Sequence, residues 1–128
     1  MNNEVLTIKK QKKTPFIELD PAQGVLTIEG RSIPENPESF YNIVYSSLAE
    51  YYKSPQKLTT FNFQFEYINS GSSKFILRFF HLIKKQYDAG NDCVVKWYYE
   101  EDDENILDLG QHYKNTFKLP FQFIEIYG

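Results

Sequence analysis

The strongest constraint on the fold is a regular change between two hydrophobic spacings along the chain. Residues 58–68 begin with a two-residue alternation that is typical of a β-strand and puts four aromatic residues on one face, Phe61, Phe63, Phe65 and Tyr67. Residues 72–89 instead repeat at three- and four-residue intervals, typical of an α-helix, through Phe75, Ile76, Phe79, Phe80, Ile83 and Tyr87. Gly90-Asn91 then supplies a helix stop. Strands joined through helices favour an α/β fold.

The same two signals predict the elements in the first half of the chain. Residues 16–19 and 25–29 are short β-prone runs separated by a turn-rich loop, so they predict a β-hairpin. A helix is predicted next, because one face carries Phe40, Ile43, Val44, Ser47, Leu48 and Tyr51. Pro37 suits the start of this helix, and Pro55 lies just beyond its end.

The last third of the chain continues the alternation of strand and helix. Residues 93–99 are rich in β-branched and aromatic side chains and predict a strand. A short helix is predicted from Ile106, Leu107, Leu109 and Tyr113, and residues 121–127 alternate as an edge strand. The predicted order is β-β-α-β-α-β-α-β, which forms a mixed sheet with an N-terminal hairpin and helices packed on it.

The chain has the length of one domain. With 128 residues, a single core can bury roughly two thirds of the unfolded surface without metals or disulfides. The 11 Phe and 10 Tyr residues predict a core built largely from aromatic rings. No linker divides the chain, so we expect a basic N-terminal arm over residues 1–13 and one domain over residues 14–128. The arm carries Lys9, Lys10, Lys12 and Lys13.

Charge and cysteine content exclude several classes of protein. The net charge of −3 provides no broad attractive field for nucleic acid. No apolar run approaches the roughly 20 residues that span a bilayer, so neither a nucleic acid nor a membrane is an expected partner. The only cysteine, Cys93, cannot form an internal disulfide, and no signal-peptide pattern opens the chain. These features indicate a cytoplasmic protein.

Residue patterns that support catalysis are scarce. The only histidines are His81, which falls near the apolar face of a predicted helix, and His112, and no zinc-ligand spacing is present. The chain has no phosphate-binding loop and no dinucleotide-binding glycine motif, so no cofactor is expected. The paired carboxylates Asp102 and Asp103 look exposed, and Cys93 is expected to be buried and inert. The chain is therefore predicted to have no catalytic or metal centre.

One polar segment stands out between a predicted strand and a predicted helix. Residues 69–74 read Asn-Ser-Gly-Ser-Ser-Lys. Their short polar side chains can cap the free N–H groups of the first helical turn. The same position suits a phosphorylated hydroxyl, because a helix N-terminus offers unpaired donors and a partial positive charge. Composition leaves both interpretations open.

With this segment the chain resembles a known family, the SiaC-type biofilm-regulation phosphoproteins, whose fold is similar to the STAS domains of anti-sigma-factor antagonists. The resemblance covers nearly the whole chain. Two pieces are fairly specific when they occur together in this order: Pro34-Glu35-Asn36, and Asn69 followed by a hydroxyl residue and Ser72-Ser73-Lys74. Further matching segments are Thr14-Pro15, residues 30–33, Tyr67-Ile68, Trp97-Tyr98-Tyr99 with Asp102-Asp103-Glu104, and Leu119-Pro120-Phe121.

The resemblance implies a protein that is cycled by a dedicated serine/threonine kinase and a PP2C-type phosphatase. Its unphosphorylated form would bind and activate a diguanylate cyclase. The family acceptor, a Thr directly after the Asn, corresponds to Ser70, and Ser72 is the second choice. Gly71 also departs from the family pattern, which usually has Ser there.

The expected partner surface surrounds this acceptor. It comprises Asn69, Ser70, Gly71, Ser72, Ser73, Lys74 and Leu77, together with Glu35 and Asn36, whose loop follows a strand on the same predicted sheet edge. Local hydrogen bonding by Asn36 or Glu35, and packing of Leu77 against the first helix, are the structural alternatives.

The sequence thus predicts a STAS-like, phosphorylation-controlled switch that acts by binding other proteins. A constitutive adaptor of the same fold, in which the serines only cap a helix, is the alternative. A carboxylate-dependent hydrolase ranks third.

Overall fold

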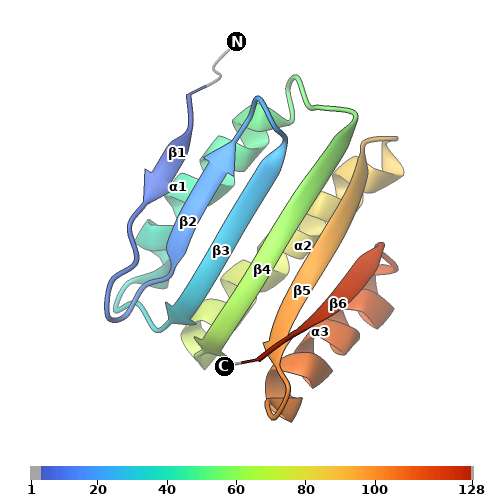
Figure 1. Cartoon of the computed structure of the whole chain (residues 1–128). Coiled ribbons are helices and arrows are strands. Elements are labelled where there is room, and N and C mark those ends of the chain that lie inside the picture. The colour runs from blue at the N-terminus through green and yellow to red at the C-terminus, as the bar shows by residue number, and fades with distance from the viewer. Residues whose placement is uncertain (1–3, 128) are drawn as a thin grey trace.

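The computed structural model describes residues 4–127 and shows one open sheet backed by helices. Six strands are arranged in the order β1-β2-β3-β4-β5-β6, the same as their order in the chain (Figure 1). All three helices lie on one face of this sheet, and α2 lies between α1 and α3. The strands are β1 (Leu6–Ile8), β2 (Phe16–Asp20), β3 (Val25–Ser32), β4 (Leu58–Ile68), β5 (Asp92–Glu100) and β6 (Phe121–Ile126).

Strand direction divides the sheet into two parts. The first three strands are antiparallel, with Ile28 opposite Ile17 and Ile17 opposite Ile8. From β3 onward every neighbouring pair is parallel, because a helix carries the chain back between successive strands. Parallel strands end at a common edge, so the loops that follow β3, β4 and β5 all leave the sheet at the same edge.

Each helix begins with the same kind of cap. The helices are α1 (Pro37–Tyr51), α2 (Ser70–Asp88) and α3 (Glu104–Phe117). The residue before each helix, Asn36, Asn69 or Asp103, accepts a hydrogen bond through its side chain from a backbone N–H of the first turn, at 3.1, 2.8 and 3.0 Å. These short polar side chains satisfy donors that the helix cannot pair internally, which fixes where each helix starts.

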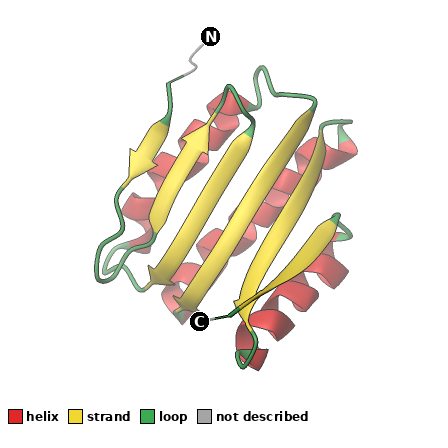
Figure 2. Cartoon of the chain, in the orientation of Figure 1, coloured by secondary structure: helices red, strands yellow, loops and turns green. Residues whose placement is uncertain are grey.

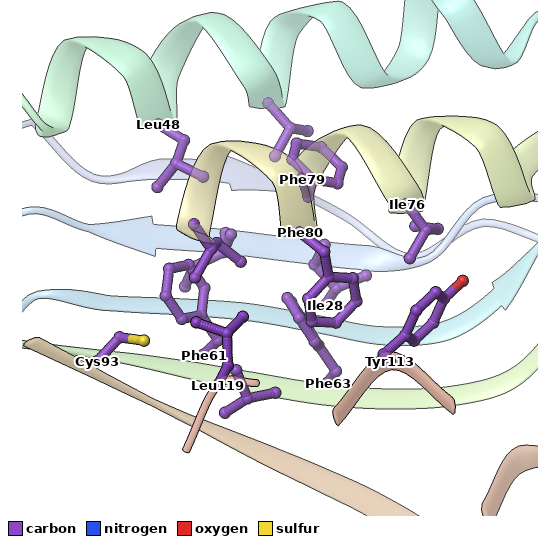
Figure 3. Packing of buried hydrophobic residues seen from close by; sticks show 14 of the residues in the cluster. Ile28, Leu48, Phe61, Phe63, Ile76, Phe79, Phe80, Cys93, Tyr113 and Leu119 are labelled. Carbon is purple, nitrogen blue, oxygen red and sulfur yellow. The ribbon is translucent and has the colours of Figure 1, made fainter. Parts of the chain in front are cut away.

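The core fills the space between the sheet and the helices with aromatic rings. Phe80 of α2 lies edge-on to Phe63 of β4 and stacks on Tyr113 of α3, with ring centroids 5.7 and 4.5 Å apart (Figure 3). Trp97 of β5 is fully buried, and its indole N–H donates to the carbonyl of Ile106 at 2.9 Å. The helices are therefore fixed to the sheet by both packing and a buried hydrogen bond.

The opposite face of the sheet carries no helix among residues 4–127 (Figure 2). Thr27, Asn62 and Lys96 lie in one row across its centre and are partly exposed. This arrangement explains the alternation in β4, where the aromatic residues face the helices and the polar residues face solvent.

The predicted α/β class is confirmed, as are the hairpin between β2 and β3, the helix start at Pro37 and the C-terminal edge strand. The narrower STAS-like label remains a prediction.

The sheet contains one strand that was not predicted. Leu6–Ile8 lies within the expected arm and pairs with β2. Three residues are too few to show periodicity, and it is pairing with β2 that makes this segment a strand. Residues 1–3 and 128 lie outside the described residues, so the division into an arm and a domain remains a prediction.

Two predicted core faces were wrong in part. Tyr67 is 52 % exposed because the β3–β4 register shifts after Gly30, so that Arg31 pairs with Tyr67 and Glu66 becomes the extra residue of a bulge. In α1, Ile43 is exposed whereas Tyr41 is buried. Both residues lie near the edge of the apolar stripe, and packing of Tyr41 against α2 decides between them.

Within residues 4–127, no helix is both long enough and apolar enough to cross a membrane.

Candidate functional site

The start of α2 lies beside the start of α1 at the carboxyl edge of the sheet. Ser32 and Ile68 end the paired parts of β3 and β4, and the N–H of Asn69 donates to the carbonyl of Ser32 at 3.0 Å. A Cβ placed on Gly71 would lie 3.8 Å from Cγ of Pro37. The loop at residues 34–36 therefore lies at the same edge of the sheet as residues 69–74, as predicted.

Asn69 is the residue that caps α2. Its side-chain oxygen accepts from the N–H of Ser72 at 2.8 Å. The Ser73 hydroxyl donates to the carbonyl of Asn69 at 3.2 Å, and Ser73 is exposed. Asn69 thus makes the capping contact that composition allowed, whereas the Ser73 hydroxyl bonds to a carbonyl four residues earlier and caps no N–H group.

Ser70 differs from its neighbours because its hydroxyl points to solvent. It is the first residue of α2 and is exposed, and within residues 4–127 no hydrogen bond engages its side chain. In the same part of the chain the N–H groups of Ser70 and Gly71 find no backbone acceptor. An enzyme can reach this hydroxyl, and two free donors lie beside it.

The first turn of α2 carries no negative charge. Glu38 and Glu104 occupy the first turns of α1 and α3, whereas α2 has no acidic residue there. An acidic group near a helix N-terminus is stabilising, typically by about 0.3–1 kcal/mol. A phosphate on Ser70 would supply the charge that the other two helices already have.

Ser72, the second predicted acceptor, is fully buried. Its hydroxyl donates to the carbonyl of Ser32 at 3.2 Å and accepts from the Ser32 hydroxyl at 2.9 Å. Because the Ser32 hydrogen is used in this way, the buried Tyr41 hydroxyl donates to Ser32 Oγ. Burial raises the pKa of Tyr41 to about 12, so it stays protonated. Ser72 therefore joins β3, α1 and α2, and a kinase cannot reach its hydroxyl in this conformation.

The neighbouring loop makes the local contacts that were considered as the alternative. Asn36 caps α1, and Glu35 forms an exposed ion pair with Lys13 at 3.2 Å. Both side chains remain exposed at the edge that carries Ser70. Their use in partner binding remains a prediction.

The outer surface of α2 continues from Ser70. Leu77 is 37 % exposed, and Lys74 and Arg78 are also exposed. The Arg78 guanidinium lies 4.6 Å from the ring centroid of Tyr45 on α1. His81 lies edge-on to Phe117 of α3, with centroids 4.9 Å apart. The predicted exposure of Leu77 is confirmed, while its role in an interface remains a prediction.

Cys93 and Asp103 are two of the other residues that the sequence offered for chemistry. Cys93 is buried, and burial raises the pKa of its thiol to about 11. Asp103 is only partly exposed, contrary to expectation, because it caps α3. No group of three or more His, Cys, Asp or Glu residues within 4–127 could hold a metal ion.

A pocket of about 220 Å³ opens where β4 and β5 separate beyond the pair Phe63 and Trp97. Two of its carboxylates are already engaged, since Glu66 pairs with Lys10 at 3.1 Å and Asp103 caps α3.

The fold and the site together are an open α/β sheet with an accessible serine hydroxyl at the start of a helix. The model of the SiaC family, described as regulatory phosphoproteins, matches residues 8–126, and the chain belongs to this family. An uncharacterised protein of Pseudomonas aeruginosa is 23 % identical over 116 residues, which cover 91 % of this chain and 92 % of that protein.

Solved structures agree with this assignment at the level of the fold. Apo-SiaC from Pseudomonas aeruginosa superposes with a TM-score of 0.87 at 23 % identity, covering 94 % of this chain and 98 % of that one. SiaC in complex with the diguanylate cyclase SiaD, whose activator it is, gives a TM-score of 0.89 at 22 % identity, covering 94 % and 99 %.

Sequence reasoning missed two residues that shape the site. Ser32 and Tyr41 lie beneath the first turn of α2, far from it in the chain. No spacing pattern connects them to Ser72, and the only sequence signal was a polar residue at the end of a strand.

Proposed function

We propose that the chain is a non-enzymatic switch that binds and activates a diguanylate cyclase and is released by phosphorylation of Ser70. The observation that carries this proposal is the exposed Ser70 hydroxyl at the start of α2, which has no hydrogen-bond partner within residues 4–127. Membership of a family of regulatory phosphoproteins supports it, as does the activation of SiaD by a SiaC of the same fold.

Phosphorylation here changes a surface without requiring a new fold. Phosphate adds about −1.5 to −2 charges and three strong acceptor oxygens. The free N–H groups of Ser70 and Gly71 can donate hydrogen bonds to these oxygens. The helix dipole also favours the negative charge of the phosphate at this end of α2. The modified helix start would stay folded while its outer surface becomes negative.

The same proposal assigns the enzymes that act on Ser70. A serine/threonine kinase would add the phosphate and a PP2C-type phosphatase would remove it. Because the kinase uses ATP and the cyclase uses GTP, the cycle would operate in the cytoplasm. The exposed position of Ser70 meets the access that both enzymes need.

The alternative is a constitutive adaptor in which the serines only cap α2. Asn69 caps α2, and the Ser73 hydroxyl bonds to a backbone carbonyl, so local structural roles account for these two residues. Ser70 has no such contact among residues 4–127, so the adaptor leaves its free hydroxyl unexplained.

Phosphate-affinity gels of protein made in its native host test the proposal. We expect a shifted band for the wild type and for Ser73→Ala, the exposed control, and none for Ser70→Ala. A diguanylate cyclase that copurifies with the protein from this host would serve as the binding partner. Ser70→Glu should weaken binding to this copurifying cyclase only in part, because a carboxylate has less charge and fewer oxygens than phosphate. A shifted band that persists in Ser70→Ala would refute Ser70 as the acceptor, and the absence of any shifted band would favour the adaptor.

A further inference from the structure

The charge of the protein is divided unevenly between α2 and the rest of the chain. Between Ser70 and Asp88 the sequence has four basic residues and one acidic residue, a net charge of +3. The whole chain carries −3. Helix α2, which lies between the other two helices (Figure 1), is therefore positive in a protein whose net charge is negative.

The positive charge lies on the outward stripe of α2. Lys74, Arg78 and Lys85 are exposed and repeat at near-helical spacing over about 16 Å of helix. Ser70 is four residues before Lys74 and therefore begins the same stripe. We call Lys74, Arg78 and Lys85 the basic ridge.

The basic ridge has no acidic partner within the described part of the chain. The ion pairs there join Lys10 to Glu66, Lys13 to Glu35, Lys53 to Glu50 and Lys84 to Asp88. Lys74 and Arg78 instead lie over the ring of Phe75, at 5.3 and 5.9 Å from its centroid. These contacts hold two cations close to the helix surface and leave their charge unneutralised.

An apolar side chain lies beside these cations. Leu77 is 37 % exposed and occupies the turn between Lys74 and His81. Interfaces combine a small apolar centre with a charged rim that selects the partner. Leu77 bordered by the basic ridge has this composition.

We propose that the basic ridge, with Leu77 at its edge, docks an acidic protein surface that has an apolar residue opposite Leu77. This inference rests on the proposed function, since it names the chemistry of the surface that the cyclase presents. It also gives a physical cause for release. A phosphate on Ser70 would reduce the net charge of α2 from +3 to about +1 and would repel an acidic partner.

A first experiment needs no natural partner. Isotope-labelled full-length protein would be titrated with a short synthetic peptide rich in glutamate and containing leucine, and amide shifts would be followed by NMR. We expect the shifts to concentrate on residues 73–85 and to weaken in Ser70→Glu. Shifts confined to the lysines at residues 9–13, or no shifts at all, would overturn the inference while leaving the proposed function intact.

A second experiment measures association with the copurifying cyclase by stopped flow. Lys74→Gln with Lys85→Gln should slow association by about ten-fold at low salt and by much less at high salt. Lys57→Gln with Lys118→Gln removes the same charge from exposed positions outside α2 and should stay within about two-fold of wild type. Equal slowing in the two double variants would contradict the proposal that the partner docks on the basic ridge. Absence of cyclase binding in the wild type would count against the proposed function alone.

Discussion

Two adjacent tyrosines at the end of α1 have buried hydroxyl groups with opposite effects on stability. One hydroxyl is hydrogen-bonded and the other is not. Tyr51 and Tyr52 are both buried. The Tyr51 hydroxyl bonds to Thr59 Oγ1 at 2.7 Å and accepts from the N–H of Gln56 at 3.0 Å. The Tyr52 hydroxyl is a buried oxygen with no hydrogen-bond partner in the described residues. A buried polar group without a partner costs free energy.

Removing these two hydroxyl groups should therefore have opposite effects. We expect Tyr51→Phe to lower the free energy of unfolding by about 1–3 kcal/mol, because Thr59 and Gln56 lose a partner. Tyr52→Phe should leave it unchanged or raise it by up to about 1 kcal/mol. Urea unfolding of both variants measures the difference. A larger loss in Tyr52→Phe than in Tyr51→Phe would show that a water or another group satisfies Tyr52.

Buried thiol and phenol groups also make the free energy of unfolding depend on pH in the alkaline range. The pKa of Cys93 is raised to about 11, and those of Tyr41 and Tyr113 to about 12, by burial in each case. The unfolded chain releases these protons from about pH 9 for Cys and pH 10 for Tyr. Since the unfolded state then binds fewer protons, the free energy of unfolding falls as pH rises above about 9.

The contribution of these groups to the free energy of unfolding should be constant from pH 7.5 to 8.5 and should decline between pH 9 and 12. Cys93→Ala should reduce the decline at pH 9–10, where the unfolded thiol ionises to a greater extent than each unfolded tyrosine, although loss of sulfur packing lowers stability at every pH. Urea midpoints at a series of pH values measure both effects. An identical slope in the variant would exclude Cys93 as a source of the decline.

At the scale of elements, two helical glycines have different roles. A Cβ on Gly110 of α3 would lie 2.5 Å from Trp97 Cδ1 and Nε1, so the absence of a side chain lets α3 approach the sheet. A Cβ on Gly71 of α2 would meet only Asn69 and Pro37, at an ordinary 3.8 Å. A side chain with a Cβ would thus fit at Gly71.

Alanine at these two glycines is a matched test of helix packing. Gly110→Ala should lower the free energy of unfolding by about 2–3 kcal/mol, because α3 or Trp97 must move. Gly71→Ala should be neutral or stabilising by up to about 1 kcal/mol, because it reduces the freedom of the unfolded chain. Thermal unfolding of both variants measures these changes. Similar melting temperatures for the two would contradict the close approach of α3 to Trp97.

At the scale of the whole molecule, the helical layer presents two exposed aliphatic side chains on different helices. Leu77 on α2 is 37 % exposed and Ile43 on α1 is 54 % exposed. Only Leu77 lies on the helix that starts at Ser70. The two residues therefore separate a specific docking surface from general loss of surface hydrophobicity.

Leu77→Asp should weaken cyclase binding at least ten-fold if Leu77 is a central apolar anchor, since such anchors contribute on the order of 2 kcal/mol. Ile43→Asp should leave binding unchanged. Calorimetric titration measures both affinities, and melting temperatures show whether the fold is intact. A fall of several degrees in Leu77→Asp would assign Leu77 to the core instead.

Local chemistry made much of the architecture predictable. The periods of two and near 3.6, the caps at Asn36 and Asn69 and the positive φ of Gly90 all depend on a few consecutive residues. The position of the candidate site was predictable for the same reason, because residues 69–74 form one stretch at the junction of β4 and α2. Strand β1 and the bulge opposite Gly30 were not predictable, since each is defined by pairing with another strand.

The sequence by itself determined the α/β class, the order of elements from β2 to β6 and the family, because spacing and short motifs specify them locally. Only the tertiary structure decided which of the two candidate acceptors, Ser70 and Ser72, is accessible. Ser72 is buried and bonds to Ser32, 40 residues earlier in the chain, whereas Ser70, two residues before Ser72, faces solvent. The basic ridge likewise became visible only when packing on both sides of α2 fixed which of its residues point outward. Such choices depend on contacts between distant segments, which no local pattern encodes.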